Sequence, residues 1–118
     1  EGSLLMSLGS LVTVVGSGAT NVTIVVLDNG MYEVTGGQAT PATQIPVDFA
    51  ALARGAGFPT VIHCSNVNRW RNEAPAAFSA LGPRLMWLQV GPTDAKIPRA
   101  PSGEIRPRLA RLREALTD

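Results

Sequence analysis

The order of apolar and polar residues along the chain predicts alternating helices and strands. From residue 3 to residue 16 the apolar side chains recur at helical spacing, and Ser3 and Gly16 suit the two ends of a helix. Valine and threonine lower the helix propensity of its second half, so a strand stays open as the alternative there. Residues 22–27 are an almost continuous apolar run rich in β-branched side chains, which is typical of a strand covered on both faces in a parallel sheet.

The same alternation continues after a stretch rich in glycine and proline, residues 30–46, which we expect to be a long loop. Proline is tolerated only in the first turn of a helix, so Pro75 places the start of one helix at Asn72. The expected elements are a helix over 48–55, a strand over 60–63, a helix over 72–81, a strand over 85–90 and, after a Pro-rich connector, an amphipathic helix over 105–116. This order predicts a three-layer α/β fold, a mostly parallel sheet with helices on both faces.

Length and composition restrict the classes of function. We expect residues 1–118 to form one domain, with 45% apolar and 16% charged residues as in globular proteins. A formal net charge of +1 argues against a nucleic-acid partner, and no apolar run is long enough to span a membrane. The single cysteine, Cys64, permits no internal disulfide, and no signal peptide is recognisable, so we expect a soluble, cytoplasmic protein. Because the chain starts at Glu1 without an initiator methionine, we also expect its upstream part to be missing.

Two polar segments can meet at one edge of the predicted sheet. Ligands of open α/β sheets gather at the carboxyl ends of the strands, where Asp28-Asn29-Gly30 follows the strand 22–27. Glu1-Gly2-Ser3 opens the first helix, and a helix start attracts anions. The carboxylate of Glu1 and the amide oxygen of Asn29 are ligands that Mg²⁺ prefers. Read without context, the first segment is only a helix start and the second an ordinary turn.

The two segments together resemble the signature of thiamine-diphosphate-dependent enzymes, Gly-Asp-Gly followed about two dozen residues later by Asn-Asn. Here residues 3–27 separate Gly2 from Asp28. The continuation NGMYEVTGGQ, residues 29–38, is similar to the phosphonopyruvate and sulfopyruvate decarboxylase branch, and the resemblance covers essentially the whole chain. Glu1 stands where the family has aspartate, and Asp28 where it has its first asparagine.

This resemblance implies a set of binding residues. Mg²⁺ would be bound by Glu1, by the side chain of Asn29 and by the backbone oxygen of Met31. The thiamine-diphosphate pocket would be lined by Gly2, Ser3, Asn29, Gly30, Met31 and Tyr32, with Gly2 and Ser3 holding the diphosphate. Residues 35–38 would lie in a loop near the cofactor or the substrate.

The resemblance also implies a decarboxylase of a small 2-oxo acid that works as an oligomer. The glutamate that activates the cofactor would come from a pyrimidine-binding domain or subunit, so we assign no catalytic residue and expect the chain alone to be inactive. Two alternatives remain open. One is the equivalent domain of a 2-oxoacid:ferredoxin oxidoreductase or an acetohydroxyacid synthase, and the other is a degenerate structural subunit that binds no cofactor.

Two other groups of residues suggest sites but are interpreted as structural. His63 and Cys64 fall at a strand end, yet no third group stands at a suggestive spacing, which favours packing. Trp70 lies between two arginines, Arg69 and Arg71, and is interpreted as part of a solvated loop because the net charge is close to zero.

Overall fold

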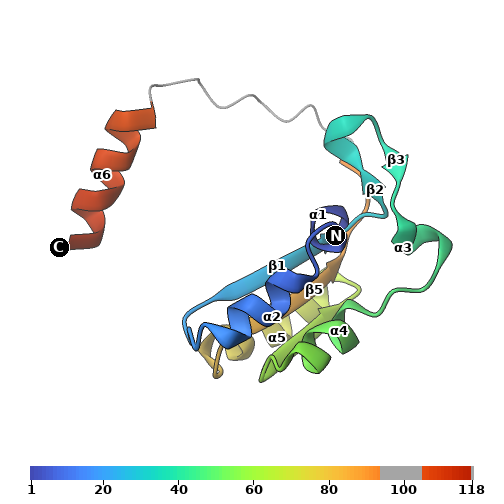
Figure 1. Ribbon diagram of the computed structural model, residues 1–118, viewed down its shortest axis with the longest axis horizontal. Coiled ribbons are helices and arrows are strands. Elements are labelled where there is room, and N and C mark those ends of the chain that lie inside the picture. Colours follow the sequence, from blue (N-terminus) through green and yellow to red (C-terminus); the bar gives the residue numbers. More distant parts are fainter. Residues whose placement is uncertain (94–104, 118) are drawn as a thin grey trace.

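A computed structural model describes residues 1–93 and 105–117, and its main feature is a parallel sheet (Figure 1). Within the described residues this sheet has three strands in the order β1-β5-β4, namely β1 (Thr23–Asp28), β4 (Thr60–Cys64) and β5 (Arg84–Gln89). Both pairs of neighbours are parallel. The carboxyl ends of all three strands therefore lie at one edge, and the predicted parallel α/β sheet is confirmed.

Helices pack on both faces of this sheet. On one face α2 (Gly9–Gly16) and α4 (Phe49–Ala56) build the core cluster, in which Phe49 meets the ring of Trp87 edge-on at a centroid distance of 5.6 Å. On the other face α5 (Val67–Ser79) contacts β4 and β5. Side chains alternate along a strand, so Trp87 faces the α2/α4 layer and the fully buried Met86 faces α5. The three-layer prediction is confirmed.

Strand β1 is less covered than its sequence predicts. It lies at an edge of the sheet, and α5 packs on β4 and β5 rather than on β1. Val25 and Leu27 are consequently 44% and 55% exposed, whereas Val26, on the α2/α4 face, is buried. For the described residues, the prediction that this strand is covered on both faces is wrong.

The first predicted helix is divided into α1 (Gly2–Leu5) and α2. Between them two backbone hydrogen bonds span three residues instead of the four of an α-helix. The N–H of Ser7 donates to the carbonyl of Leu4, and the N–H of Ser10 donates to the carbonyl of Ser7. The hydroxyl of Ser7 also donates to the carbonyl of Ser3 at 3.0 Å. Both residue types at this break weaken a helix. The serine hydroxyl competes for backbone hydrogen bonds, and the glycine that follows, Gly9, makes the backbone more flexible. The second half is nevertheless helical, which rules out the strand alternative.

Residues 30–46 contain more structure than the predicted loop. Two very short strands, β2 (Met31–Tyr32) and β3 (Gln38–Ala39), pair antiparallel around a 3₁₀ turn, η1 (Glu33–Thr35). A one-turn helix, α3 (Pro41–Gln44), follows. Two-residue strands are too short for any periodicity to reveal them.

The ends of α4 follow the expected rules, but the start of α5 does not. Asp48 caps α4 by accepting the N–H of Ala51 at 2.8 Å, and Gly57 ends it with a φ of +101°. The predicted start of α5 at Asn72 is wrong, because Asn66 caps it by accepting the N–H of Arg69 at 2.9 Å. Pro75 therefore lies inside the helix.

The earlier start of α5 also corrects the interpretation of the aromatic and basic residues near position 70. Trp70 lies on this helix and not in a solvated loop, and its ring meets Phe78 edge-on at 6.0 Å. Arg69 forms an ion pair with Glu73 at 2.6 Å, one helical turn further along.

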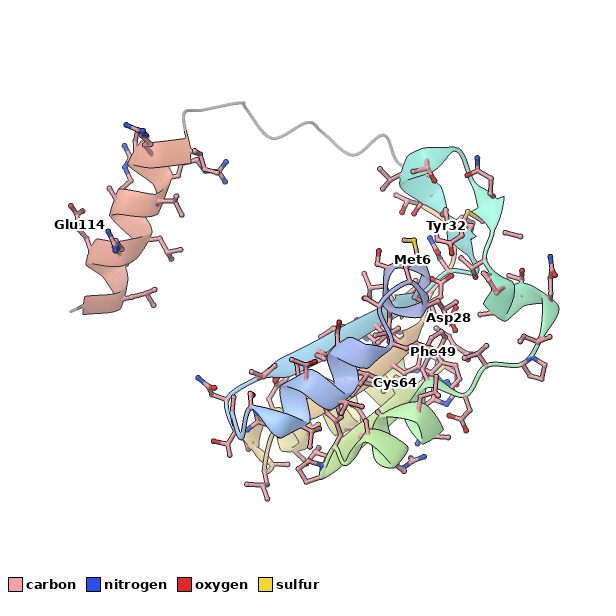
Figure 2. The ribbon with its side chains drawn as sticks, in the orientation of Figure 1. Met6, Asp28, Tyr32, Phe49, Cys64 and Glu114 are labelled. Atoms are coloured by element: carbon pink, nitrogen blue, oxygen red, sulfur yellow. The ribbon has the colours of Figure 1, made fainter. Side chains whose placement is uncertain are left out.

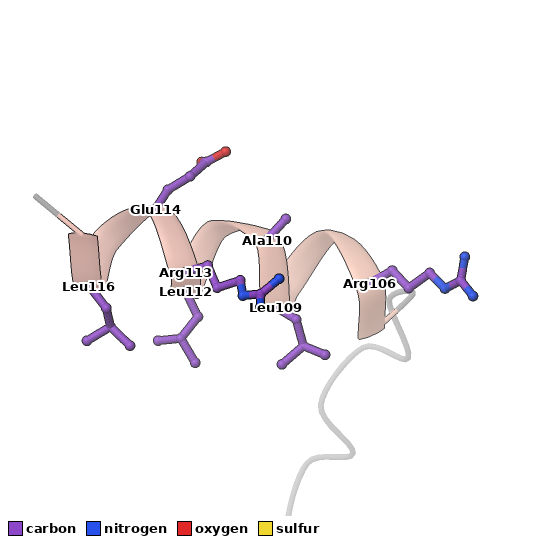
Figure 3. A pocket seen from close by; sticks show the side chains of 7 residues that line it. All are labelled: Arg106, Leu109, Ala110, Leu112, Arg113, Glu114 and Leu116. Carbon is purple, nitrogen blue, oxygen red and sulfur yellow. The ribbon is translucent and has the colours of Figure 1, made fainter.

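The last helix, α6 (Ile105–Thr117), agrees with the predicted range 105–116. Its side chains from 105 to 116 are all exposed. The hollow of about 570 Å³ shown in Figure 3 is lined by α6 residues alone, so it is the open flank of one helix. The predicted connector falls largely on residues 94–104, outside the described residues. Within residues 1–93 and 105–117, no helix has the length and apolar composition needed to cross a bilayer.

The start of α5 can be tested with two asparagine substitutions. Asn66→Ala removes the cap and should lower the free energy of unfolding by about 1 kcal/mol. Asn72→Ala changes an exposed position inside the helix and should alter it by no more than about 0.5 kcal/mol. Urea denaturation of both variants measures these differences. A larger loss for Asn72→Ala than for Asn66→Ala would return the helix start to residue 72.

Candidate functional site

The two polar segments singled out in the sequence meet at the carboxyl edge of the sheet. Figure 2 labels Met6, which follows the first segment, and Tyr32, which follows the second, and both side chains line the same cavity. A cavity of about 410 Å³ opens between them. It is lined by Glu1, Gly2, Ser3, Met6, Leu27, Asn29, Met31, Tyr32, Glu33, Val34 and Thr35. Of the predicted site residues, Gly30 alone is outside this lining; it forms the turn between β1 and β2, with a φ of +74°.

The carboxylate of Glu1 joins the first segment to the second. Its Oε2 accepts the backbone N–H of Asn29 at 3.3 Å, and its Oε1 accepts the hydroxyl of Thr40 at 2.9 Å. The backbone nitrogen of Glu1 donates to the carbonyl of Leu27 at 2.7 Å. Hydrogen bonds to a charged group each contribute roughly 1.5–3 kcal/mol, so these contacts hold the start of α1 against the end of β1.

Thr40 is a member of this site that the sequence did not indicate. Its side chain is fully buried, with no exposed surface, although it is polar. Its N–H donates to the carbonyl of Gly30 at 3.0 Å, and its own carbonyl accepts the hydroxyl of Thr43 at 2.6 Å. A buried hydroxyl needs a partner, and the one it has is Glu1. No motif marks Thr40, because the contact depends on the fold of residues 30–46.

The side chain of Asn29 has a defined orientation. Its Nδ2 donates to Oε2 of Glu33 at 3.0 Å, and its Oδ1 accepts the N–H of Met31 at 3.2 Å. A carboxylate can only accept and a backbone N–H can only donate, so only one orientation of the amide satisfies both partners. Oδ1 retains a second lone pair.

A glycine is needed at position 2 for steric reasons. A Cβ atom at Gly2 would overlap the ring of Tyr32, lying 2.7 Å from its Cδ1. The ring of Tyr32 therefore packs directly on the backbone that begins α1. This approach leaves the first backbone N–H groups of α1 close to the cavity, and such groups have no partner within a helix.

The side chain of Asp28 lies on the face of β1 that packs against Trp87, and not on the side of the cavity. Its Oδ2 accepts the indole N–H of Trp87 at 2.9 Å, and it does not line the cavity. Of the neighbouring pair Asp28 and Asn29, only Asn29 therefore presents its side chain to the site. The Asp28–Trp87 bond ties the end of β1 to β5.

His63 and Cys64 do not line this cavity. The ring of His63 stacks on Trp87 at a centroid distance of 3.8 Å, and its Nε2 is buried without a hydrogen-bond partner among the described residues. Cys64 is buried, and burial, reinforced by the charge of Glu73 and opposed by that of Arg69, raises the pKa of its thiol. A raised pKa disfavours the reactive thiolate. Both residues are consistent with the packing interpretation.

The chemistry of the cavity suits an oxygen-seeking cation and an anion beside it. Glu1 offers a carboxylate and Asn29 an amide oxygen, the hard ligands that Mg²⁺ prefers. In the part of the chain that the structure describes, no three His, Cys, Asp or Glu side chains gather into a metal cluster. A cation bound here would therefore need further oxygen atoms from its ligand, as Mg²⁺ takes from phosphates.

Comparisons with known proteins place the chain in one family. The family model described as thiamine pyrophosphate enzyme, C-terminal TPP binding domain, matches residues 1–86. Among curated proteins, the phosphonopyruvate decarboxylase of Streptomyces viridochromogenes is 37% identical over 92 residues, 78% of this chain and 23% of that protein. The phosphonopyruvate decarboxylase of Streptomyces hygroscopicus is 32% identical over 118 residues, all of this chain and 29% of that protein.

A third relative is the sulfopyruvate decarboxylase subunit beta of Methanothermobacter thermautotrophicus, 36% identical over 98 residues. The match covers 83% of this chain and 49% of the subunit. The chain thus spans between about a quarter and a half of the length of these relatives.

The close contact between Gly2 and Tyr32 predicts a specific loss of stability. Gly2→Ala forces a Cβ into the ring and should lower the free energy of unfolding by about 1–3 kcal/mol, as overpacking does. Gly9→Ala is the matched control, because no atom lies within 4 Å of the added Cβ and alanine favours the helix. Thermal and urea denaturation compare the two. Equal stability of both variants would contradict the contact.

Proposed function

The chain belongs to the thiamine pyrophosphate enzymes and carries their C-terminal TPP-binding domain, and from this premise we propose that the cavity binds thiamine diphosphate together with Mg²⁺. In this proposal the metal is bound by Glu1, by the side chain of Asn29 and by the backbone oxygen of Met31. Gly2 and Ser3 receive the diphosphate, and the segment from Gly30 to Tyr32 borders the same cofactor.

The observation that carries the proposal is the contact between Glu1 and Asn29. The carboxylate of the first lies against the backbone N–H of the second at 3.3 Å, although 28 positions separate them in the sequence. A carboxylate and an amide oxygen at one cavity form part of an octahedral oxygen set, and diphosphate oxygens can complete it. The metal offsets the repulsion between the carboxylate and the diphosphate, which are both negative.

The diphosphate is best received by backbone groups rather than by side-chain charge. The helix α1 has a single turn, so its dipole is small, but Gly2 and Ser3 line the cavity and their backbone N–H groups have no acceptor within the helix. Among residues 1–93 and 105–117 no lysine or arginine lines the cavity, so within this part of the chain the metal would be the main positive charge beside the diphosphate.

The chain contributes binding and orientation, and we assign it no catalytic residue. When bound, thiamine diphosphate supplies the electron sink for the loss of CO₂ from a 2-oxo acid. The carboxylates of Glu1 and Glu33 each accept hydrogen bonds at both oxygen atoms, so neither is placed as the activating base. The activating glutamate would come from a pyrimidine-binding domain or subunit in an oligomer.

The substrate in this proposal is a small 2-oxo acid with a phosphonate or sulfonate tail. This choice is supported by the relatives, two of which are named phosphonopyruvate decarboxylases and one a sulfopyruvate decarboxylase subunit. The word subunit in the last name supports an assembly of more than one chain.

One observation favours a second candidate, a structural subunit that binds no cofactor. Both oxygen atoms of Glu1 already accept hydrogen bonds from the protein, so this carboxylate also serves as a purely structural link. Cofactor titration separates the two candidates.

Removing the amide of Asn29 should weaken the binding of thiamine diphosphate and Mg²⁺. In calorimetric titration with thiamine diphosphate and Mg²⁺, the full chain should bind, and Asn29→Ala should bind at least about tenfold more weakly because a metal ligand is lost. Asn72→Ala, an exposed asparagine on α5, is the control and should bind as the unchanged chain does. No binding by any of the three would support the structural subunit.

Decarboxylation should require a partner that supplies the activating glutamate. The purified chain, saturated with thiamine diphosphate and Mg²⁺, should release no CO₂ from phosphonopyruvate or sulfopyruvate above the uncatalysed rate. Detection of CO₂ by a coupled assay checks this. Turnover by the chain alone would mean that one of its own carboxylates activates the cofactor.

A further inference from the structure

Glu33 lies beside the proposed metal site, and no function has so far been attached to it. It stands in the turn η1 and is exposed, yet its carboxylate accepts three hydrogen bonds. Oε2 accepts Nδ2 of Asn29 at 3.0 Å and the hydroxyl of Thr93 at 3.2 Å, and Oε1 accepts the N–H of Thr93 at 2.6 Å. Most exposed glutamate side chains move freely in solvent, whereas hydrogen bonds at both oxygen atoms hold this one in a single position.

We infer that Glu33 is a positioning residue, which turns the amide of Asn29 so that its oxygen, and not its nitrogen, faces the metal. This inference rests on the proposed function of the cavity. Among the described residues that line the cavity, Asn29 alone carries an amide side chain, and this amide can bind a cation only through its oxygen.

The argument follows from which groups can donate. The carboxylate of Glu33 accepts hydrogen bonds and cannot donate, so the nitrogen of the Asn29 amide must face it. Turning the amide over would set its oxygen against the carboxylate and its NH₂ against the N–H of Met31, two repulsive contacts in place of two hydrogen bonds. The charge on Glu33 therefore selects one orientation.

Glu33 can select this orientation because it is itself fixed. Thr93, just beyond the end of β5, supplies two donors to it from a distance of 60 positions in the sequence. The N–H of Val90 also donates to the carbonyl of Asp28 at 2.9 Å, so the ends of β5 and β1 are held together. The frame of the sheet thus orients Glu33, and Glu33 orients Asn29.

The variant that tests this is Glu33→Gln, which keeps the size of the side chain and exchanges one acceptor oxygen for an NH₂ donor. The NH₂ group replaces one of the two oxygen atoms, so it faces either the Asn29 NH₂ or the Thr93 N–H as a donor against a donor, and the negative charge is lost. The Asn29 amide then loses either its acceptor or the contact that holds that acceptor in place. Loss of a group that orients a metal ligand typically lowers metal affinity by 10–100-fold. Glu73→Gln on α5 is the control, because it lies away from the cavity and should change nothing in cofactor binding.

Two measurements on the full chain decide the matter. The first is calorimetric titration with thiamine diphosphate and Mg²⁺, in which Glu33→Gln should weaken binding at least about tenfold, while adding Glu33→Gln to Asn29→Ala should cost little more. The second is the pair of side-chain amide resonances of Asn29 by ¹⁵N NMR without cofactor. These should shift in Glu33→Gln and stay in place in Glu73→Gln.

The outcomes separate this inference from the proposed function. Unchanged titration and unchanged Asn29 resonances in Glu33→Gln overturn the role of Glu33 and leave the cofactor site standing. An equal loss with and without Asn29 shows that Glu33 contacts the metal directly, which also overturns a positioning role. If no variant and not even the unchanged chain binds cofactor, the proposed function fails, and the NMR comparison still tests whether Glu33 orients Asn29.

A second variant covers the case in which Glu33→Gln does not fold. Thr93→Val removes the hydroxyl donor at 3.2 Å but keeps the backbone N–H, so it loosens Glu33 without changing its charge. It should shift the Asn29 resonances in the same direction by a smaller amount. Resonances identical to those of the unchanged chain would count against the inference.

Discussion

The carboxylate of Glu1 is the contact on which the site depends. It links the start of α1 to the end of β1 through the N–H of Asn29, and to residues 30–46 through the buried hydroxyl of Thr40. Two backbone hydrogen bonds support the same arrangement, from the nitrogen of Glu1 to the carbonyl of Leu27 and from the N–H of Thr40 to the carbonyl of Gly30. A negative group that accepts from two donors at a half-buried position is strongly held, because hydrogen bonds to charges are strong and solvent screening is reduced there.

The parallel sheet brings the linked segments to the same place. Parallel strands share their carboxyl edge, so β1 delivers Asn29 there and β5 delivers Thr93, which holds Glu33. The packing of Phe49 against Trp87, and the bond from Trp87 to Asp28, anchor the same strand ends in the core. The sheet therefore fixes the backbone of the site. The carboxylates of Glu1 and Glu33 fix the side chains of Thr40 and Asn29 through hydrogen bonds.

The periodic pattern of apolar residues predicted most of the helices and strands. It predicted little of the structure that depends on individual contacts between residues far apart in the sequence. Runs of apolar residues located all three strands of the parallel sheet, and Asp48 and Gly57 marked the ends of α4. Pro75 predicts the start of α5 at the wrong place, because the cap by Asn66 and the packing of Trp70 outweigh one lost helical hydrogen bond. The break after α1 and the two-residue strands were not predicted, because a periodic pattern of apolar residues needs more residues than these features contain.

The site itself was predictable only as far as its motif. Glu1, Gly2 and Asn29 could be named because they recur at a fixed interval in a known signature, and the structure brings them to one cavity. Thr40 lies outside the signature, and Glu33 falls within residues 29–38 without a role that the signature assigns; the contacts of both arise from how residues 30–46 fold back on β1. Such contacts depend on three-dimensional proximity, which a pattern of residue types does not contain.

The most direct test of this account is to locate the metal. Crystals of the chain grown with thiamine diphosphate and Mn²⁺ in place of Mg²⁺ would show the ion by its anomalous scattering. The account predicts one peak within coordination distance of the Glu1 carboxylate, Oδ1 of Asn29 and the backbone oxygen of Met31, with the diphosphate bound at Gly2 and Ser3. A peak elsewhere, or a diphosphate bound away from this edge of the sheet, would contradict it.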